Sequence, residues 1–184
     1  MSTTPSPTTA VTAPPTSSLR PGCPAGSATG GEKAAEAEKI RAVIPAGWDV
    51  RISRTPADGT GSASDPFLIA ANFALPQRTS TFGNGAVESM GATKVFVSLV
   101  EYGASSVGKA LFAHQGLPCP LRADQFDPNT MQPSVAGMAG AQVFFTEQRR
   151  AFALYVVVGS YAARDKLLPL VNRFLAGVTI QPPG

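Results

Sequence analysis

The sequence predicts an α+β fold in which an antiparallel sheet packs against a C-terminal amphipathic helix. Three patterns support this class: two apolar runs around a short charged loop at 142–158, an alternating run at 94–102, and apolar residues at helical spacing in 163–176. The 184 residues include 43% apolar and 15% charged side chains. That composition suits one hydrophobic core and excludes collagen-like, coiled-coil and strongly acidic disordered proteins.

Residues 1–31 differ in composition from the rest of the chain. They are mostly Thr, Ser, Pro, Ala and Gly, and Arg20 is their only charged residue. Such a segment buries too little apolar surface to offset the entropy lost when it is ordered. We therefore expect a disordered tail or stalk, either a spacer to an anchor or a frayed terminus, in front of a single α+β domain at 32–184.

Hydrophobicity and charge restrict the partners. The longest uninterrupted apolar run, 151–159, is far shorter than the roughly 20 residues of a membrane-spanning helix. Residues 1–24 contain no apolar stretch of the kind found in a secretory leader. The net charge of +3 is spread along the chain, which argues against a nucleic-acid partner. We expect any membrane attachment to use an anchor outside this chain.

The first half of the domain is predicted to contain one helix and two strands. Residues 32–43 are rich in Ala, Glu and Lys, which favour a short helix that ends before Pro45. Residues 48–52 alternate apolar and polar side chains from Trp48 onward, which predicts a half-buried strand. Residues 67–75 place Phe67, Ile69, Ala71, Phe73 and Leu75 on one side and Leu68, Ala70, Asn72 and Ala74 on the other, which predicts a second strand closed by Pro76.

The second half begins with a third strand at 94–102 and a short helix at 107–114. The strongest local pattern is the hairpin at 142–158, with a predicted loop at 147–150. The second run of this hairpin is apolar on both faces, which predicts a central strand covered on both sides.

The C-terminal helix at 163–176 is predicted to face the core with its leucines and Phe174, opposite a polar face that includes Asn172. Pro169 lies inside this segment, so the helix either begins only a few residues earlier or kinks there. A short strand at 178–180 follows. The predicted core consists of Trp48, Phe152, Leu154, Val156, Leu170 and Phe174.

The order of these elements resembles the PsbP-like domain, which occurs among photosystem accessory proteins and actinobacterial lipoproteins. The likeness rests on the segment Ile-Pro-Ala-Gly-Trp at 44–48, the strand at 95–100 and the block 140–174. It implies an α+β sandwich and an accessory or binding role without a shared catalytic apparatus. Fold likeness alone does not establish function.

Few residues offer catalytic or metal-binding chemistry. His114 is the only histidine, which excludes sites built on paired histidines. The chain has no phosphate-binding loop and no nucleophile elbow. Glu101 and Asp124 are conceivable as an acid–base pair, although carboxylates at strand ends and in loops are usually solvated. We predict no catalytic residue, no metal site and no cofactor.

Charged and sulfur-containing residues leave two questions open. Arg149 and Arg150 at the hairpin tip would contact an anionic partner or, as is usual for such tips, serve solubility. Cys23 and Cys119 lack metal-ligand spacing, so they are two free thiols in a reducing compartment or one disulfide in an oxidising one. The stalk-like composition of the tail favours the disulfide.

Candidate binding residues come from irregular segments. Phe126 and Met131 lie in 117–132, where no strand or helix pattern would bury them. If exposed they would mark a binding patch together with Tyr102, and otherwise Phe126 would hold the loop against the sheet. The irregular segments 55–65 and 77–92 are expected to contribute to the same surface.

Together these patterns predict a non-enzymatic, extracytoplasmic binding or accessory module of a bacterial cell envelope. Its expected partner is a protein or a small hydrophobic ligand. The alternatives are a cytoplasmic protein-interaction domain and a carboxylate-dependent hydrolase that uses Glu101 or Asp124.

Overall fold

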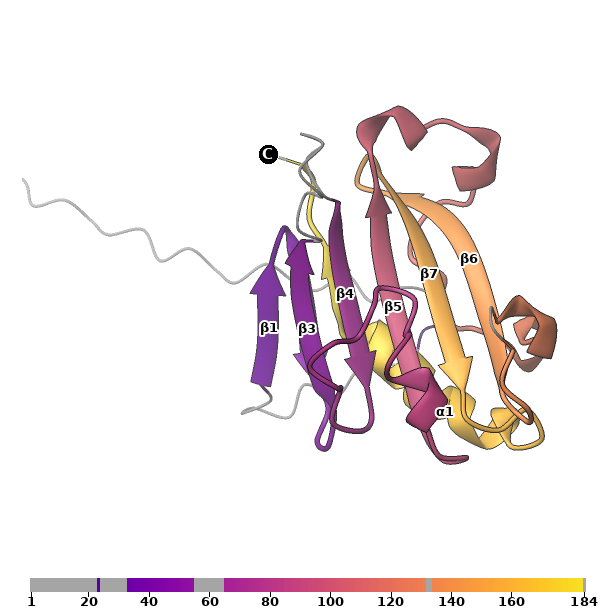
Figure 1. The fold of residues 1–184 in the computed structure, drawn as a ribbon. Helices are drawn as coiled ribbons and strands as arrows, with labels where there is room; N and C mark the ends of the chain where they lie inside the picture. The colour runs from indigo at the N-terminus through magenta and orange to yellow at the C-terminus, as the bar shows by residue number, and fades with distance from the viewer. Residues whose placement is uncertain (1–22, 24–32, 55–64, 132–133, 184) are drawn as a thin grey trace, which may run out of the picture.

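The computed structural model describes Cys23 and residues 33–54, 65–131 and 134–183. Within these residues the chain forms two antiparallel sheets and one C-terminal α-helix (Figure 1). The mixed α+β class and the C-terminal helix predicted from the sequence are therefore confirmed. The predicted disordered tail, residues 1–31, lies outside the described residues except for Cys23.

The larger sheet has five strands in the order β3-β4-β5-β7-β6, and every neighbouring pair is antiparallel. The strands are β3 (Asp49–Arg54), β4 (Pro66–Ala71), β5 (Val95–Tyr102), β6 (Ala139–Glu147) and β7 (Arg150–Val158). All nine residues of β7 are buried, which confirms the prediction of a strand covered on both faces.

The smaller sheet has the order β1-β2-β8, formed by β1 (Lys33–Ala37), β2 (Ile40–Ile44) and β8 (Val178–Ile180). The helix predicted at 32–43 is therefore wrong, and a hairpin replaces it. Glu38 and Lys39 form its turn with φ of 54° and 61°, the left-handed conformation of tight hairpins. Because successive side chains of a strand point to opposite faces, β2 can bury Ile40 in the core where it pairs with β8. This burial outweighs the helix propensity of Ala and Glu.

Two further local predictions are corrected. The β6–β7 turn has two residues, Gln148 and Arg149, because Glu147 and Arg150 pair across the strands, so the predicted loop at 147–150 is too long. The helix predicted at 107–114 is replaced by two short 3₁₀ turns, interrupted at Gly108 with a φ of 86°. The 3₁₀ turns are η1 (Val87–Ser89), η2 (Ala104–Ser106), η3 (Ala110–Phe112), η4 (Ala123–Gln125) and η5 (Pro128–Thr130).

The α-helix, α1 (Arg164–Ala176), begins only five residues before Pro169, as one of the two predicted alternatives required. Its buried apolar residues are Leu167, Leu168, Val171, Phe174 and Leu175. Leu170 is 39% exposed, so its predicted place in the core is wrong. Asn172, predicted on the polar face, is buried. The segment around Leu121 covers the side of the helix that carries Asn172. The spacing of apolar residues within the helix does not predict this contact.

Both faces of the five-stranded sheet are covered. The helix and the small sheet cover one face, and the connection between β4 and β5 crosses the other (Figure 1). On the helix side, the rings of Trp48 and Phe174 stack with centroids 4.8 Å apart. On the other side, Phe96, Met131, Met138 and Tyr155 belong to a second apolar cluster. The core predicted around Trp48, Phe152 and Phe174 is thus present on the helix side.

Truncation of Phe174 tests this packing. Phe174 is fully buried, so the variant Phe174→Ala should lower the free energy of unfolding by about 3 to 5 kcal/mol. The matched variant Leu170→Ala, on the exposed side of the same helix, should cost less than about 1 kcal/mol. Urea unfolding followed by Trp48 fluorescence measures both. Equal losses for the two variants would contradict this packing of the helix.

Candidate functional site

An open cleft of about 670 Å³ lies where the two sheets meet. It is formed by the β1–β2 turn, the end of β3, the start of β4, the end of β5 and the residues after β8. Figure 1 shows these ends gathered at one edge of the molecule, beside the labelled C-terminus. The cleft is lined by Glu36, Ala37, Glu38, Lys39, Arg54, Asp65, Pro66, Glu101, Tyr102, Gly103, Ala104, Arg150, Gln181 and Pro183.

Arg150, the first residue of β7, organises this cleft. Its side chain is 5% exposed and forms a salt bridge with Glu101 at the end of β5, a carboxylate that is itself 17% exposed. The guanidinium donates five hydrogen bonds, which is the full number of its N–H groups. Nε and Nη2 donate to the two oxygens of Glu101 at 2.8 and 2.6 Å, Nη2 to the Glu38 carbonyl at 3.0 Å, and Nη1 to the carbonyls of Lys39 and Gln181 at 3.1 Å.

These contacts join the two sheets. Arg150 and Glu101 belong to the five-stranded sheet, whereas the three carbonyls belong to the β1–β2 turn and the residue after β8. The left-handed turn at Glu38 and Lys39 aims consecutive carbonyls at one cation. A buried guanidinium requires such full pairing, because an unpaired charge in this position would be costly.

A second ion pair lies at the rim of the cleft. Arg54 at the end of β3 donates to Oε2 of Glu38 at 2.6 Å, and this hydrogen bond raises the pKa of the guanidinium further above its ordinary value. The pair is substantially exposed, so it contributes little to stability. It does place a cation and a carboxylate at the mouth of the cleft.

Glu36 and Asp65 supply the remaining carboxylates of the cleft, and Glu36 accepts a hydrogen bond from the Gln181 side-chain amide at 3.1 Å. Partial burial raises the pKa of the Asp65 carboxyl, the negative charge of Glu101 raises it further, and Arg54 opposes both effects. Within the described residues no hydrogen bond to this carboxylate is formed. Asp65 is therefore the cleft carboxylate that is best able to accept a hydrogen bond from a ligand.

Of the three predicted binding residues, only Tyr102 lines the cleft. Phe126 and Met131 are each 3% exposed. Phe126 packs into the main core, as the alternative interpretation required, and Met131 joins the second cluster. Phe126 and Met131 would mark a binding patch only if they were exposed, and they are buried. Of the irregular segments expected at the surface, 55–64 lies outside the described residues.

The conceivable catalytic residues do not converge. Glu101 is held by Arg150, while Asp124 is exposed and paired with Arg122, Nε to Oδ1, at 3.1 Å. Hydrogen bonding to Arg122 lowers the pKa of the Asp124 carboxyl. His114 is exposed, and neither it nor Asp124 lines the cleft. Across the part of the chain that the structure describes, no group of acidic, histidine or cysteine side chains is arranged to hold a metal ion.

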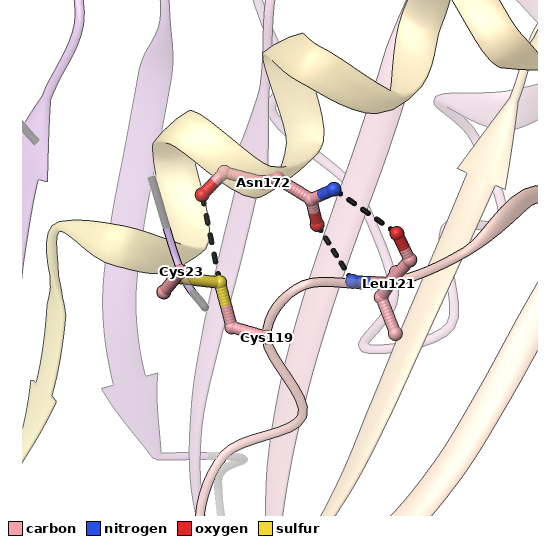
Figure 2. Close-up of a disulfide and its surroundings, with 4 residues drawn as sticks. All are labelled: Cys23, Cys119, Leu121 and Asn172. Carbon is pink, nitrogen blue, oxygen red and sulfur yellow. Dashed lines mark hydrogen bonds between the residues drawn. A yellow bond between two sulfur atoms is a disulfide. The ribbon is translucent and has the colours of Figure 1, made fainter. Parts of the chain in front are cut away.

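Cys23 and Cys119 are joined in a disulfide, with Cα atoms 5.3 Å apart (Figure 2). The Cys119 sulfur lies 3.8 Å from the Asn172 carbonyl oxygen of α1, a contact only, since a disulfide sulfur has no proton to donate. The Asn172 amide accepts from the Leu121 N–H at 2.8 Å and donates to the Leu121 carbonyl at 3.0 Å. The disulfide therefore fastens residue 23 to a segment that is itself clamped to the helix.

Sequence inspection missed Arg150 and Asp65 as cleft residues. Arg150 and Arg149 were predicted to lie together at the solvent-exposed tip of the hairpin, whereas only Arg149 is exposed and Arg150 is buried. The available signal was a cation at the start of an apolar run, opposite a strand that ends in Glu101. Asp65 carried no signal, because the charged groups that act on it, Arg54 and Glu101, belong to β3 and β5 and are distant in the sequence.

Comparisons with known proteins add no relative. No protein-family model, curated protein or solved structure matches the chain. In the described residues no helix is long and apolar enough to cross a membrane.

Removal of the Arg150 side chain tests its role. Arg150→Ala leaves Glu101 without its ion-pair partner and removes the side-chain donor from three carbonyls, of which that of Lys39 keeps the Gln181 N–H. The substitution should therefore cost about 3 to 5 kcal/mol of unfolding free energy. Arg149→Ala, at the exposed neighbouring position, should change it by no more than about 0.5 kcal/mol. Chemical denaturation measures both values. A loss below about 1 kcal/mol for Arg150→Ala would show that the sheets are joined by other contacts.

Proposed function

We propose that this protein is a non-enzymatic, extracytoplasmic binding module of a bacterial cell envelope, with a PsbP-like arrangement of its sheet and helix and a stalk formed by its N-terminal segment. The observation that supports binding most directly is the open cleft at the junction of the two sheets. Its volume, about 670 Å³, lies within the range of small-molecule and peptide sites.

The state of the carboxylates favours binding over proton-transfer catalysis. Both oxygens of Glu101 accept hydrogen bonds from Arg150, and Glu38 is engaged by Arg54. A general acid or base needs an oxygen that is free to reach the reacting proton. The hydrolase alternative therefore depends on Asp65 alone among the inner carboxylates, without the His114 or Asp124 partner that it would need.

The chemistry of the lining favours a polar partner. Four carboxylates and three cations surround the cleft, and Tyr102 is its aromatic contribution. A polypeptide segment with charged side chains and backbone N–H groups matches such a surface, whereas a small hydrophobic ligand would cover these charged groups without pairing them. We accordingly favour a protein or peptide partner that donates a hydrogen bond to Asp65.

The compartment is proposed from the cysteines. A disulfide between Cys23 and Cys119 would persist in an oxidising environment and be reduced in a bacterial cytoplasm. It closes a loop with a sequence separation of 96, for which the chain-entropy model gives a stabilisation of up to about 4 to 5 kcal/mol. A cytoplasmic interaction domain would forgo that stabilisation.

Mass spectrometry of alkylated, non-reduced protein tests the compartment. Protein recovered from its native cells should lack free thiols and yield one peptide pair that links Cys23 to Cys119. The Cys119→Ser variant supplies the reference for an unlinked chain. Two alkylated cysteines in native material would refute the extracytoplasmic proposal and favour the cytoplasmic alternative.

A peptide panel tests the cleft. Heteronuclear NMR of the whole protein with basic, acidic and zwitterionic tetrapeptides should show shifts at Tyr102, Gly103 and Gln181, strongest for the basic set, without peptide cleavage. Asp65→Asn removes the proposed acceptor carboxylate and should weaken binding at least threefold, since a charge-assisted hydrogen bond is worth about 1 kcal/mol or more. Asp124→Asn, outside the cleft, should bind as the unchanged protein does.

Two results would contradict this site. Shifts that avoid the cleft, or equal affinity for Asp65→Asn and the unchanged protein, would place binding elsewhere. Peptide hydrolysis that Asp65→Asn abolishes would establish the hydrolase alternative.

A further inference from the structure

The connection that follows β5, residues 103–116, extends beyond the end of the five-stranded sheet (Figure 1). It presents two large aliphatic side chains to solvent: Leu111 is 59% exposed and Val107 is 36% exposed. Leu111 is the most exposed large apolar side chain in the described residues. Single exposed apolar side chains are common on protein surfaces, whereas apolar side chains exposed together mark an interaction surface.

This connection is held rigidly at its base. Phe112 is buried and lies in an aromatic cluster with Tyr102 and Phe144, at centroid distances of 5.3 and 5.5 Å. The Thr146 hydroxyl and N–H donate to the carbonyls of Phe112 and His114, both at 2.8 Å. Leu111 is therefore presented to solvent from an anchored turn.

Three exposed cations lie on the same edge of the molecule. Lys109 stands between the two aliphatic residues, Arg149 forms the β6–β7 turn, and Lys39 forms the β1–β2 turn. Two hydrogen bonds connect these turns: Arg150 donates to the Lys39 carbonyl, and the Thr146 hydroxyl near the end of β6 donates to the Phe112 carbonyl. We call Lys39, Val107, Lys109, Leu111 and Arg149 the tip patch.

Three carboxylates at this end of the molecule are engaged by other groups. Glu38 and Glu101 are paired with Arg54 and Arg150, and Glu147, at the end of β6, accepts a hydrogen bond from the Leu117 N–H at 2.8 Å. In the part of the chain that the structure describes, Lys39, Lys109 and Arg149 take part in no ion pair. The tip patch thus combines an excess of positive charge with protruding aliphatic side chains.

We propose that the tip patch docks the protein on an anionic lipid surface. Leu111 and Val107 enter the boundary between headgroups and acyl chains, and the three cations lie against the phosphates. The aliphatic tips favour lipid over an acidic polymer, since a polyanion offers them no apolar region to enter. This docking does not depend on occupancy of the cleft, although it would turn the mouth of the cleft toward the membrane.

Vesicle partitioning of the whole protein tests the proposal. Binding to vesicles of equal parts phosphatidylglycerol and phosphatidylcholine should exceed binding to pure phosphatidylcholine, and added salt should weaken it. The triple variant Lys39→Ala, Lys109→Ala, Arg149→Ala should bind about 100-fold less, at about fivefold for each cation. Leu111→Ser alone should also weaken binding several-fold while leaving the circular dichroism spectrum unchanged.

Matched controls come from the exposed side of α1, away from the tip patch. Lys166→Ala and Leu170→Ser remove the same kinds of exposed side chain and should leave partitioning unchanged. Asp65→Asn should also partition normally, which separates this proposal from that for the cleft. Equal binding to both vesicle types, or equal losses for tip and α1 variants, would overturn the proposal. So would salt-sensitive binding to polyphosphate that exceeds vesicle binding and ignores Leu111→Ser.

Discussion

The buried guanidinium of Arg150 is the constraint on which the arrangement of the two sheets depends. Its five hydrogen bonds reach β5, the β1–β2 turn and the residue after β8. Because the cation is almost fully removed from water, each acceptor must stay in place, or the charge loses compensation that solvent cannot restore. Hydrophobic packing brings the sheets together, and this cation specifies how their ends meet.

The same pairing shapes the cleft and limits its chemistry. With Glu101 and Glu38 engaged, the cleft offers a preorganised polar surface, with Asp65 as its available acceptor. Preorganisation favours recognition, because little side-chain entropy is lost when a partner binds. Elsewhere on the molecule, the disulfide and the Asn172 amide fasten the segment around Cys119 and Leu121 to α1. The cleft and the disulfide therefore lie in separate parts of the fold.

Local patterns predicted those elements whose burial is decided by their own side chains. The central strand β7 and the apolar face of α1 carry so much contiguous hydrophobic surface that no other arrangement would bury it. Prediction failed where local preference and long-range burial disagreed. Residues 32–43 favour a helix on their own, yet they form a hairpin because Ile40 and Ala42 pack into the core beside β8. Asn172 is buried because its side-chain amide pairs with the backbone of Leu121, a contact between residues far apart in the sequence.

Composition and hydrophobic periodicity, which are properties of neighbouring residues, were sufficient for the α+β class, the β6–β7 hairpin and the C-terminal helix. The cleft was beyond them, because its residues lie between Glu36 and Pro183 along the chain and meet only when two sheets pack. Arg150 shows the physical reason. Its role depends on the backbone carbonyls of residues 38, 39 and 181. Every residue has such a carbonyl, so the amino-acid sequence does not show which of them will accept a hydrogen bond from Arg150.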